Sequence, residues 1–305
     1  MTASSDNLAG ISKAEVSNFL APMAPQRQVI NWLIKILFYG ATVLVVVPIG
    51  WIAVSVLLKG VQNFQWQMLF TLPLAVDSTT STGFVHNQIS GFAHAIVGTG
   101  LLLAICVSIS LPVGLLTGIH LRSAGLASPV GLAMGILSST PAIIAGLFIY
   151  GLLVPHIKFS ALAGGCALAI LCLPVIALTT AQALGQVPAG YTTASLALGV
   201  SPTATLWRLV LPCALPSMVR GIFLSLARAG GEAAPLLFTA LSSLEFPRGL
   251  IGSPTPSLAV TIYRYATSPF RVQQEQTWAI ALVLVLLVLG IKGLVSLGTG
   301  HGDRD

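Results

Sequence analysis

Long apolar stretches broken by very few charges are the feature that most constrains how this sequence can fold. Of its 305 residues, 55% are hydrophobic, and only 14 basic and 8 acidic side chains carry a formal charge. Soluble domains are about one quarter charged, so a chain that is 7% charged cannot cover the surface of a soluble globule. The composition therefore excludes a soluble enzyme and a disordered chain, and it predicts a polytopic membrane protein.

Six stretches have the length and apolarity of a transmembrane helix, which needs about 20 mostly apolar residues. They cover residues 31–58, 94–119, 130–154, 160–180, 217–241 and 277–297. The apolar runs are continuous, whereas the strands of a transmembrane barrel alternate polar and apolar residues. We therefore expect an all-α fold with six transmembrane helices over residues 31–305, preceded by a polar tail at residues 1–30.

The basic residues predict an orientation rather than a nucleic-acid site. The net charge is +6, but the Lys and Arg residues stand singly, without the clusters and interleaved aromatic residues of a nucleic-acid surface. If the N-terminus is cytoplasmic, more of these residues fall on the inner side of the membrane than on the outer side. The positive-inside rule therefore predicts a multi-pass protein with a cytoplasmic N-terminus and no nucleic-acid partner.

Motifs for nucleotide binding, metal binding and hydrolysis are absent from the sequence. It contains no GxxxxGK[ST] loop, no HExxH and no GxSxG, and its five histidines lack metal-ligand spacing. We read His94, near a predicted helix start, as a satisfied polar residue rather than a ligand. The chain is therefore expected to bind neither metal nor ATP, and to have no enzyme activity of its own.

Two charges lie in the middle of the fifth apolar stretch. Arg228 and Glu232 are four residues apart and would share one face of a helix. Each costs about 2.5–3.5 kcal/mol at the centre of a bilayer, so such residues face a protein interior or a wet cavity. The pair either locks helices together or places Arg228 along a path for an anion, since guanidinium binds two oxyanion oxygens at once. In the second interpretation, Glu232 holds the Arg and keeps the anion from binding too tightly.

A break in the helix is predicted beside this pair. Pro235 cannot donate to the carbonyl of Gly231, and Gly230 and Gly231 add backbone freedom. Irregular backbone at membrane depth is tolerated where it is buried or lines a cavity. The break therefore favours a functional position for Arg228.

The connection between the fourth and fifth stretches predicts two short helices. Residues 191–198 are compatible with a helix that ends at Gly199. Ser201 and Pro202 can then start a second helix that runs to Leu211 and ends at Pro212. An amphipathic helix of this kind can lie in a groove on a partner protein, or it can pack on its own domain.

The same connection resembles the cytoplasmic signature of binding-protein-dependent ABC importer permeases. That signature reads EAA, three residues, Gly, nine residues, Ile, one residue, Leu-Pro. Here residues 193–195 occupy the EAA position around Ala194, Gly199 follows, Leu209 takes the Ile place, and Leu211 and Pro212 end it. The resemblance implies a loop over about residues 187–212 that couples to an ATPase. Thr193 stands where the family has Glu, so docking rests on shape, on apolar contact or on another charge such as Arg208.

Two longer runs resemble the PstA family of phosphate ABC-importer permeases. Residues 227–240, ARAGGEAAPLLFTA, are similar to that family's ARxxGExAPLLFTA stretch, and residues 141–150 are similar to its PSIxxGLFxY stretch. The resemblance covers about residues 90–297. It implies a MetI-like importer core in the bacterial inner (plasma) membrane.

What the resemblance implies is one subunit of an ATP-driven phosphate importer. The expected partners are a second permease subunit in a heterodimer, two copies of a cytoplasmic ATPase that hold the ATP, and a periplasmic phosphate-binding protein. Phosphate and membrane lipid complete the set. Four other possibilities stay open: the partner permease subunit of the same importer, a permease for another oxyanion, a secondary anion transporter with its own coupling-ion site, and a purely structural membrane subunit.

Overall fold

The computed structural model describes residues 25–73 and 90–299. By contacts, the chain divides into two units, residues 1–55 and 56–305. Most of α2 (Pro25–Asn63), a 39-residue apolar helix that contains Pro48, belongs to the first unit. Of the polar tail expected at residues 1–30, residues 1–24 lie outside the described residues, and residues 25–30 already belong to α2.

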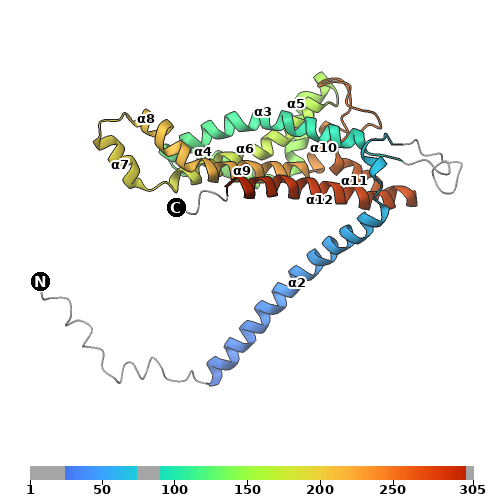
Figure 1. The fold of residues 1–305 in the computed structure, drawn as a ribbon, viewed down its shortest axis with the longest axis horizontal. Coiled ribbons are helices and arrows are strands. Elements are labelled where there is room, and N and C mark those ends of the chain that lie inside the picture. The colour runs from blue at the N-terminus through green and yellow to red at the C-terminus, as the bar shows by residue number, and fades with distance from the viewer. Residues whose placement is uncertain (1–24, 74–89, 300–305) are drawn as a thin grey trace, which may run out of the picture. The chain divides into compact units, whose positions relative to one another are not determined.

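The second unit is a bundle of long helices joined by short ones (Figure 1). Its long helices are α3 (Ala93–Ala124), α4 (Pro129–Ser139), α5 (Ala142–Ile157), α6 (Ala161–Gly185), α9 (Leu211–Gly230) and α12 (Arg271–Thr299). Its short helices are η2 (Trp66–Leu69), α7 (Ala189–Ala197), α8 (Pro202–Thr205), η3 (Leu206–Val210), α10 (Ala234–Thr239) and α11 (Leu258–Ala266). No strand occurs in the parts of the chain that the structure describes, which confirms the all-α prediction.

Among the described residues, five helices are long and apolar enough to cross a membrane, and a sixth span results if α4 and α5 are counted together. The expected third helix, over residues 130–154, is therefore wrong as a single straight element, because α4 and α5 meet at a bend of 103°. Thr140 has the extended backbone that a residue before proline prefers (ψ 128°), and Pro141 is the N-cap residue of α5.

The main helix pair of the bundle, α3 with α6, meets along a seam of glycines. A Cβ atom on Gly118 would lie 2.5 Å from Cβ of Thr180, and one on Gly114 would lie 2.9 Å from Cβ of Ile176. Small residues at this spacing allow two helix backbones to approach closely in a membrane. Gly131 and Gly135 of α4 have the same four-residue spacing, but a Cβ atom on Gly135 would have nothing within 4 Å, so none of the described helices packs closely there.

The largest apolar core joins α3, α6, α9, α10 and α11. It contains the fully buried side chains of Leu102, Leu168, Ile176, Leu236 and Val260. The helices α7 and α8 lie at one end of the bundle, and α11 lies at the other end beside the beginnings of α3 and α12 (Figure 1). The break after α9 borders this core, which contains Ala229 near the end of α9 and Leu236 of α10.

Candidate functional site

The helix that carries Arg228 ends where the sequence predicted a break. The last residue of α9 is Gly230, α10 begins at Ala234, and Pro235 lies in the first turn of α10. In the break, the N–H of Gly231 donates to the carbonyl of Arg228 at 3.0 Å, which tightens the last turn of α9. Proline is tolerated in a first helical turn because its missing N–H would have no partner there.

Glu232 stands in the break rather than on the helix, so the expectation that both charges share one helix face is wrong. They nevertheless meet: Nε of Arg228 lies 3.5 Å from Oε1 of Glu232. The Arg228 side chain is 69% exposed and the Glu232 side chain is 24% exposed in this chain. The carboxylate contacts one edge of the guanidinium, whose five N–H donors exceed what one oxygen can accept. Arg228 can therefore bind a second anion.

Arg228 also borders an open groove of about 380 Å³ between α9 and α12. Leu224 and Ala227 of α9 and Val288 of α12 are among its apolar lining residues, and its two charged lining residues are Arg228 and Lys292. Two cations above an apolar wall attract anions more strongly than they would in water, because the local dielectric constant is lower.

The α6 side of Arg228 is small and closed. Ser225 is buried, and its hydroxyl has no hydrogen-bond partner among the described residues. The Cys172 thiol lies 3.8 Å from the carbonyl of Ser225. This side of α9 is therefore packed, and Arg228 is accessible from the α12 side.

The restart of the helix is fixed by contacts from two neighbours. Gly146 of α5 lies so close to Pro235 that a Cβ atom on it would be 2.6 Å from the proline Cα. The hydroxyl of Thr239 donates to the Pro235 carbonyl at 2.8 Å, and the N–H of Ser160 donates to the Thr239 carbonyl at 3.1 Å. These contacts fix the position at which the helix restarts after the break.

The predicted stop at Gly199 is confirmed. Gly199 has a positive φ of 80°, which favours glycine. Its N–H donates to the carbonyl of Leu196, and the N–H of Val200 donates to the carbonyl of Ser195, which is the Schellman pattern of helix ends. The hydroxyls of Ser195 and Thr205 lie 2.9 Å apart and tie α7 to α8.

The predicted start of the second helix is also confirmed, but its end at Pro212 is wrong. The Ser201 hydroxyl accepts from the N–H of Ala204, and Pro202 follows as the first helical residue. The helix then runs on through a π-helical turn at η3 into α9. There the N–H of Leu211 donates to the carbonyl of Leu206, five residues back. This wider turn shifts the hydrogen-bond register just before Pro212, which supplies no N–H, and so the proline does not end the helix.

The residues that the signature singled out divide between surface and interior. Ala194, Gly199 and Pro212 are exposed, whereas Leu209 and Leu211 are half-buried. Leu211 packs against a small core formed by Ala183, Leu184, Val210, Ala214 and Met218. Large apolar side chains on the same loop stay exposed, among them Tyr191, Leu196, Trp207 and, at 84%, Leu198. Exposed apolar patches of this kind are typical of surfaces that contact a protein or a membrane.

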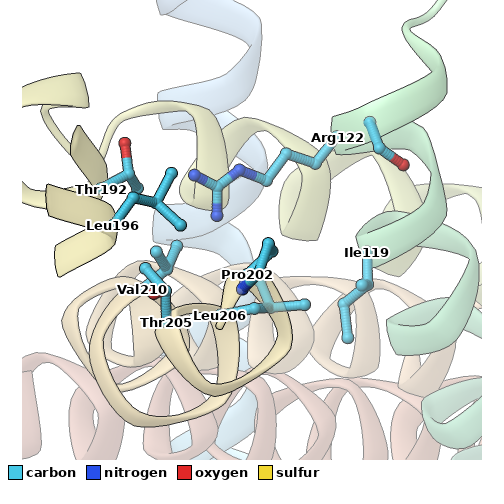
Figure 2. A pocket seen from close by; sticks show the side chains of 9 residues that line it. Ile119, Arg122, Thr192, Leu196, Pro202, Thr205, Leu206 and Val210 are labelled. Atoms are coloured by element: carbon cyan, nitrogen blue, oxygen red, sulfur yellow. The ribbon is translucent and has the colours of Figure 1, made fainter. Parts of the chain in front are cut away.

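One charged residue near this loop was missed by sequence reasoning. Arg122, from the end of α3, reaches towards Thr192 and Leu196 of α7 over a groove of about 320 Å³ (Figure 2). No Asp or Glu occurs between residues 90 and 231 of the sequence. Neither Arg122 nor Arg208 has an ion-pair partner among the described residues. A long stretch without acids would have drawn attention to Arg122, but the fold alone brings it to α7.

Within residues 25–73 and 90–299, no group of three or more His, Cys, Asp or Glu residues is placed to hold a metal ion. The remaining features are a helical membrane core, a broken helix with an Arg at the break, and an apolar loop capped by Gly199. Together they define a membrane permease subunit of the ABC importer class.

The chain belongs to the family described as binding-protein-dependent transport system inner membrane component, which it matches over residues 19–297. The phosphate transport system permease protein PstA of Yersinia pestis is 36% identical over 244 residues, which cover 78% of this chain and 79% of that protein. PstA of Haemophilus influenzae is 33% identical over 86% of this chain and 91% of that protein. PstA 2 of Mycobacterium bovis is 32% identical over 92% of this chain and 93% of that protein.

A solved structure confirms the MetI-like core. A chain of the MetNI methionine ABC transporter, in an inward-facing conformation, has a TM-score of 0.53 and covers 70% of this chain and 97% of its own length. At a sequence identity of 21%, this structural likeness shows a shared fold alone. The relatives are transport permease proteins, so this chain is a membrane transport subunit and not an enzyme.

Proposed function

We propose that the chain is the PstA-type permease subunit of an ATP-driven phosphate importer. The observation that carries the proposal is an accessible arginine at a fixed helix break, beside a groove whose charges are Arg228 and Lys292. The relatives named PstA support phosphate as the substrate. The chain forms the substrate path with a second permease subunit.

In this proposal, Arg228 is the transient anion site of the path. The guanidinium donates two parallel hydrogen bonds to phosphate oxygens. Glu232, 3.5 Å away, competes for the same guanidinium and so keeps phosphate from staying bound. No bond in phosphate is made or broken.

Transport is driven from the loop at residues 187–212. A cytoplasmic ATPase, present in two copies that hold the ATP, closes on nucleotide and moves this loop. Because α8, η3 and α9 form one continuous helix from Pro202 to Gly230, a movement of the loop reaches Arg228 directly. A periplasmic phosphate-binding protein delivers the substrate to the opposite face of the bacterial inner membrane, and the N-terminus lies in the cytoplasm.

The missing signature Glu is replaced by positive charge in this proposal. Thr193 is exposed and its hydroxyl donates to backbone carbonyls of its own helix. Arg122 and Arg208 are the charged groups near α7, so they pair with carboxylates of the ATPase. The exposed apolar side chains of the loop supply the rest of the contact.

The experiment is co-purification followed by uptake. The tagged chain is expressed with its chromosomal neighbours, and the purified complex is reconstituted in vesicles. We expect an ATPase and a second permease to co-purify, and the vesicles to take up radiolabelled phosphate only with ATP and the binding protein. Uptake without ATP, driven by an ion gradient, would identify a secondary transporter. Uptake of sulfate in place of phosphate would identify a permease for another oxyanion.

A further inference from the structure

A second polar pocket lies at the end of the bundle opposite α7 and α8. It has a volume of about 360 Å³ and is formed by the beginnings of α3 and α12, by α11 and by the loops that flank α11. Most of its lining residues are polar, and none is an Asp or Glu. The groove at Arg228 is lined by other residues, so this pocket is a separate feature.

One residue that lines the pocket is a buried histidine with an unpaired ring nitrogen. His94 is 1% exposed, and its Nδ1 has no hydrogen-bond partner among the described residues. Our expectation of a satisfied polar residue at this position is therefore wrong. A buried polar atom without a partner is costly, and it is retained where a ligand or a water completes it. The imidazole can donate from Nδ1 in the tautomer that carries the proton there.

The wall of the pocket adds donors and one positive charge. Arg264 lines it and has no ion-pair partner among the described residues. Gln273 and Ser268 contribute an amide and a hydroxyl. Burial raises the pKa of the Tyr265 phenol and the charge of Arg264 lowers it by less, so the phenol remains a protonated donor.

The helix that carries this wall is firmly held. The hydroxyl of Thr99 accepts from the N–H of Leu258 at 2.9 Å, and the hydroxyl of Ser257 caps α11 by accepting from the N–H of Val260. Leu258 and Val260 are fully buried. Because α11 is anchored, the donors on its open face keep one arrangement, as a ligand site requires.

We infer that this pocket is an oxyanion site, distinct from Arg228, which takes a tetrahedral anion such as phosphate. The lining carries this inference: residues with a guanidinium, a phenol, an amide, a hydroxyl and a buried imidazole line one pocket, and none of its lining residues is an Asp or Glu. The inference deepens the proposed function and rests on it for the identity of the anion. In the importer, this site is where phosphate is held between its release from the binding protein and its arrival at Arg228.

Phosphate protection of an introduced thiol tests the site. The assembled complex carries L244C, at an exposed lining residue that is not one of the proposed donors, and its accessible native cysteines Cys166 and Cys213 are replaced by Ala. N-ethylmaleimide alkylates the introduced thiol in the presence of increasing inorganic phosphate, without the binding protein. We expect phosphate to slow alkylation in a saturable manner, and chloride at equal ionic strength to leave the rate unchanged.

R264Q and R248Q form the decisive pair. Both arginines are exposed, but Arg248 is already paired with Glu245 and does not line the pocket. R264Q is expected to weaken protection by phosphate about tenfold or more, because it removes a charged donor, whereas R248Q leaves protection intact. H94N tests the buried donor and, in complexes that assemble, is also expected to weaken protection by phosphate.

Three results would overturn the inference. The first is no protection by phosphate in a complex that imports phosphate, and the second is protection that survives R264Q. The third is protection that occurs only when the binding protein is added, because a carboxylate of the binding protein would then be the group that occupies the pocket. The site and the proposed function fail separately. Protection by another oxyanion in a complex that does not import phosphate would refute the proposed substrate and leave the site standing.

Discussion

Arg228 is accessible because of where the helix ends, not because of its own sequence position. An uninterrupted α9 would have placed Glu232 one turn above it on the same face. The break instead puts the carboxylate against one edge of the guanidinium at 3.5 Å and leaves the α12 side open. Arg228, whose charge would be costly in lipid, thus presents its hydrogen-bond donors to a groove.

Replacing Arg228 by Gln is expected to abolish phosphate uptake, at least about a hundredfold, since bidentate charged hydrogen bonds to the anion are lost. Assembly of the complex should stay normal, because the Arg228 side chain is 69% exposed in this chain and its loss removes little packing. Uptake by vesicles is the measurement. R248Q is the matched control, since Arg248 also pairs with a nearby Glu and is exposed. Full uptake by R228Q at normal expression would remove Arg228 from the path.

Arg122 tests whether positive charge replaces the signature Glu. R122E is expected to weaken binding of the ATPase and to reduce coupled uptake, because it places a like charge opposite the carboxylates proposed on the partner. R122K should retain most of the binding. Pull-down of the ATPase at rising salt measures the effect, and the wild type should lose binding as salt screens the contact. Equal binding by R122E and the wild type would refute the charge contact.

At the level of elements, Gly199 is the joint between the two short helices of the loop. Nothing lies within 4 Å of a Cβ atom built on Gly199, so a substitution there acts through the backbone alone. G199V is expected to uncouple ATP hydrolysis from uptake, because a β-branched residue at φ 80° costs about 1–2 kcal/mol and redirects the loop. The ratio of phosphate imported to ATP hydrolysed is the measurement.

Gly190 offers the matched control for this joint. It lies in α7, also has nothing within 4 Å, and has no positive φ. G190V should therefore leave coupling unchanged, and G199N should be tolerated because Asn also adopts the left-handed conformation. Normal transport and normal ATPase pull-down by G199V would show that the loop is wrongly assigned.

Much of the fold was predictable from the sequence, because apolar length and capping residues are local signals. Apolar length predicted the membrane spans, and capping residues predicted the helix end at Gly199 and the helix start at Ser201. Four features were not predictable. The bend at Pro141 and the passage of the helix through Pro212 depend on how neighbours and a π-turn absorb a proline, and the meeting of Arg122 with α7 depends on tertiary packing. The unpaired Nδ1 of His94 likewise requires the packed fold to be seen.

At the scale of the whole molecule, the proposed function places the energy source of transport on another subunit. The isolated chain is expected neither to bind nor to hydrolyse ATP, since its sequence contains no phosphate-binding loop. A photoreactive ATP analogue applied to the purified complex should label the ATPase subunit alone. Labelling of this chain would contradict the assignment of roles.

The glycine seam between α3 and α6 has a consequence for measuring motion in the complex. Because the backbones are this close, with Gly118 against Thr180, we expect the two helices to move together as one rigid pair during transport. Such a pair supplies an internal reference distance. Spin labels across it should report one unchanging distance, against which any displacement of the loop at residues 187–212 can be read in the same sample.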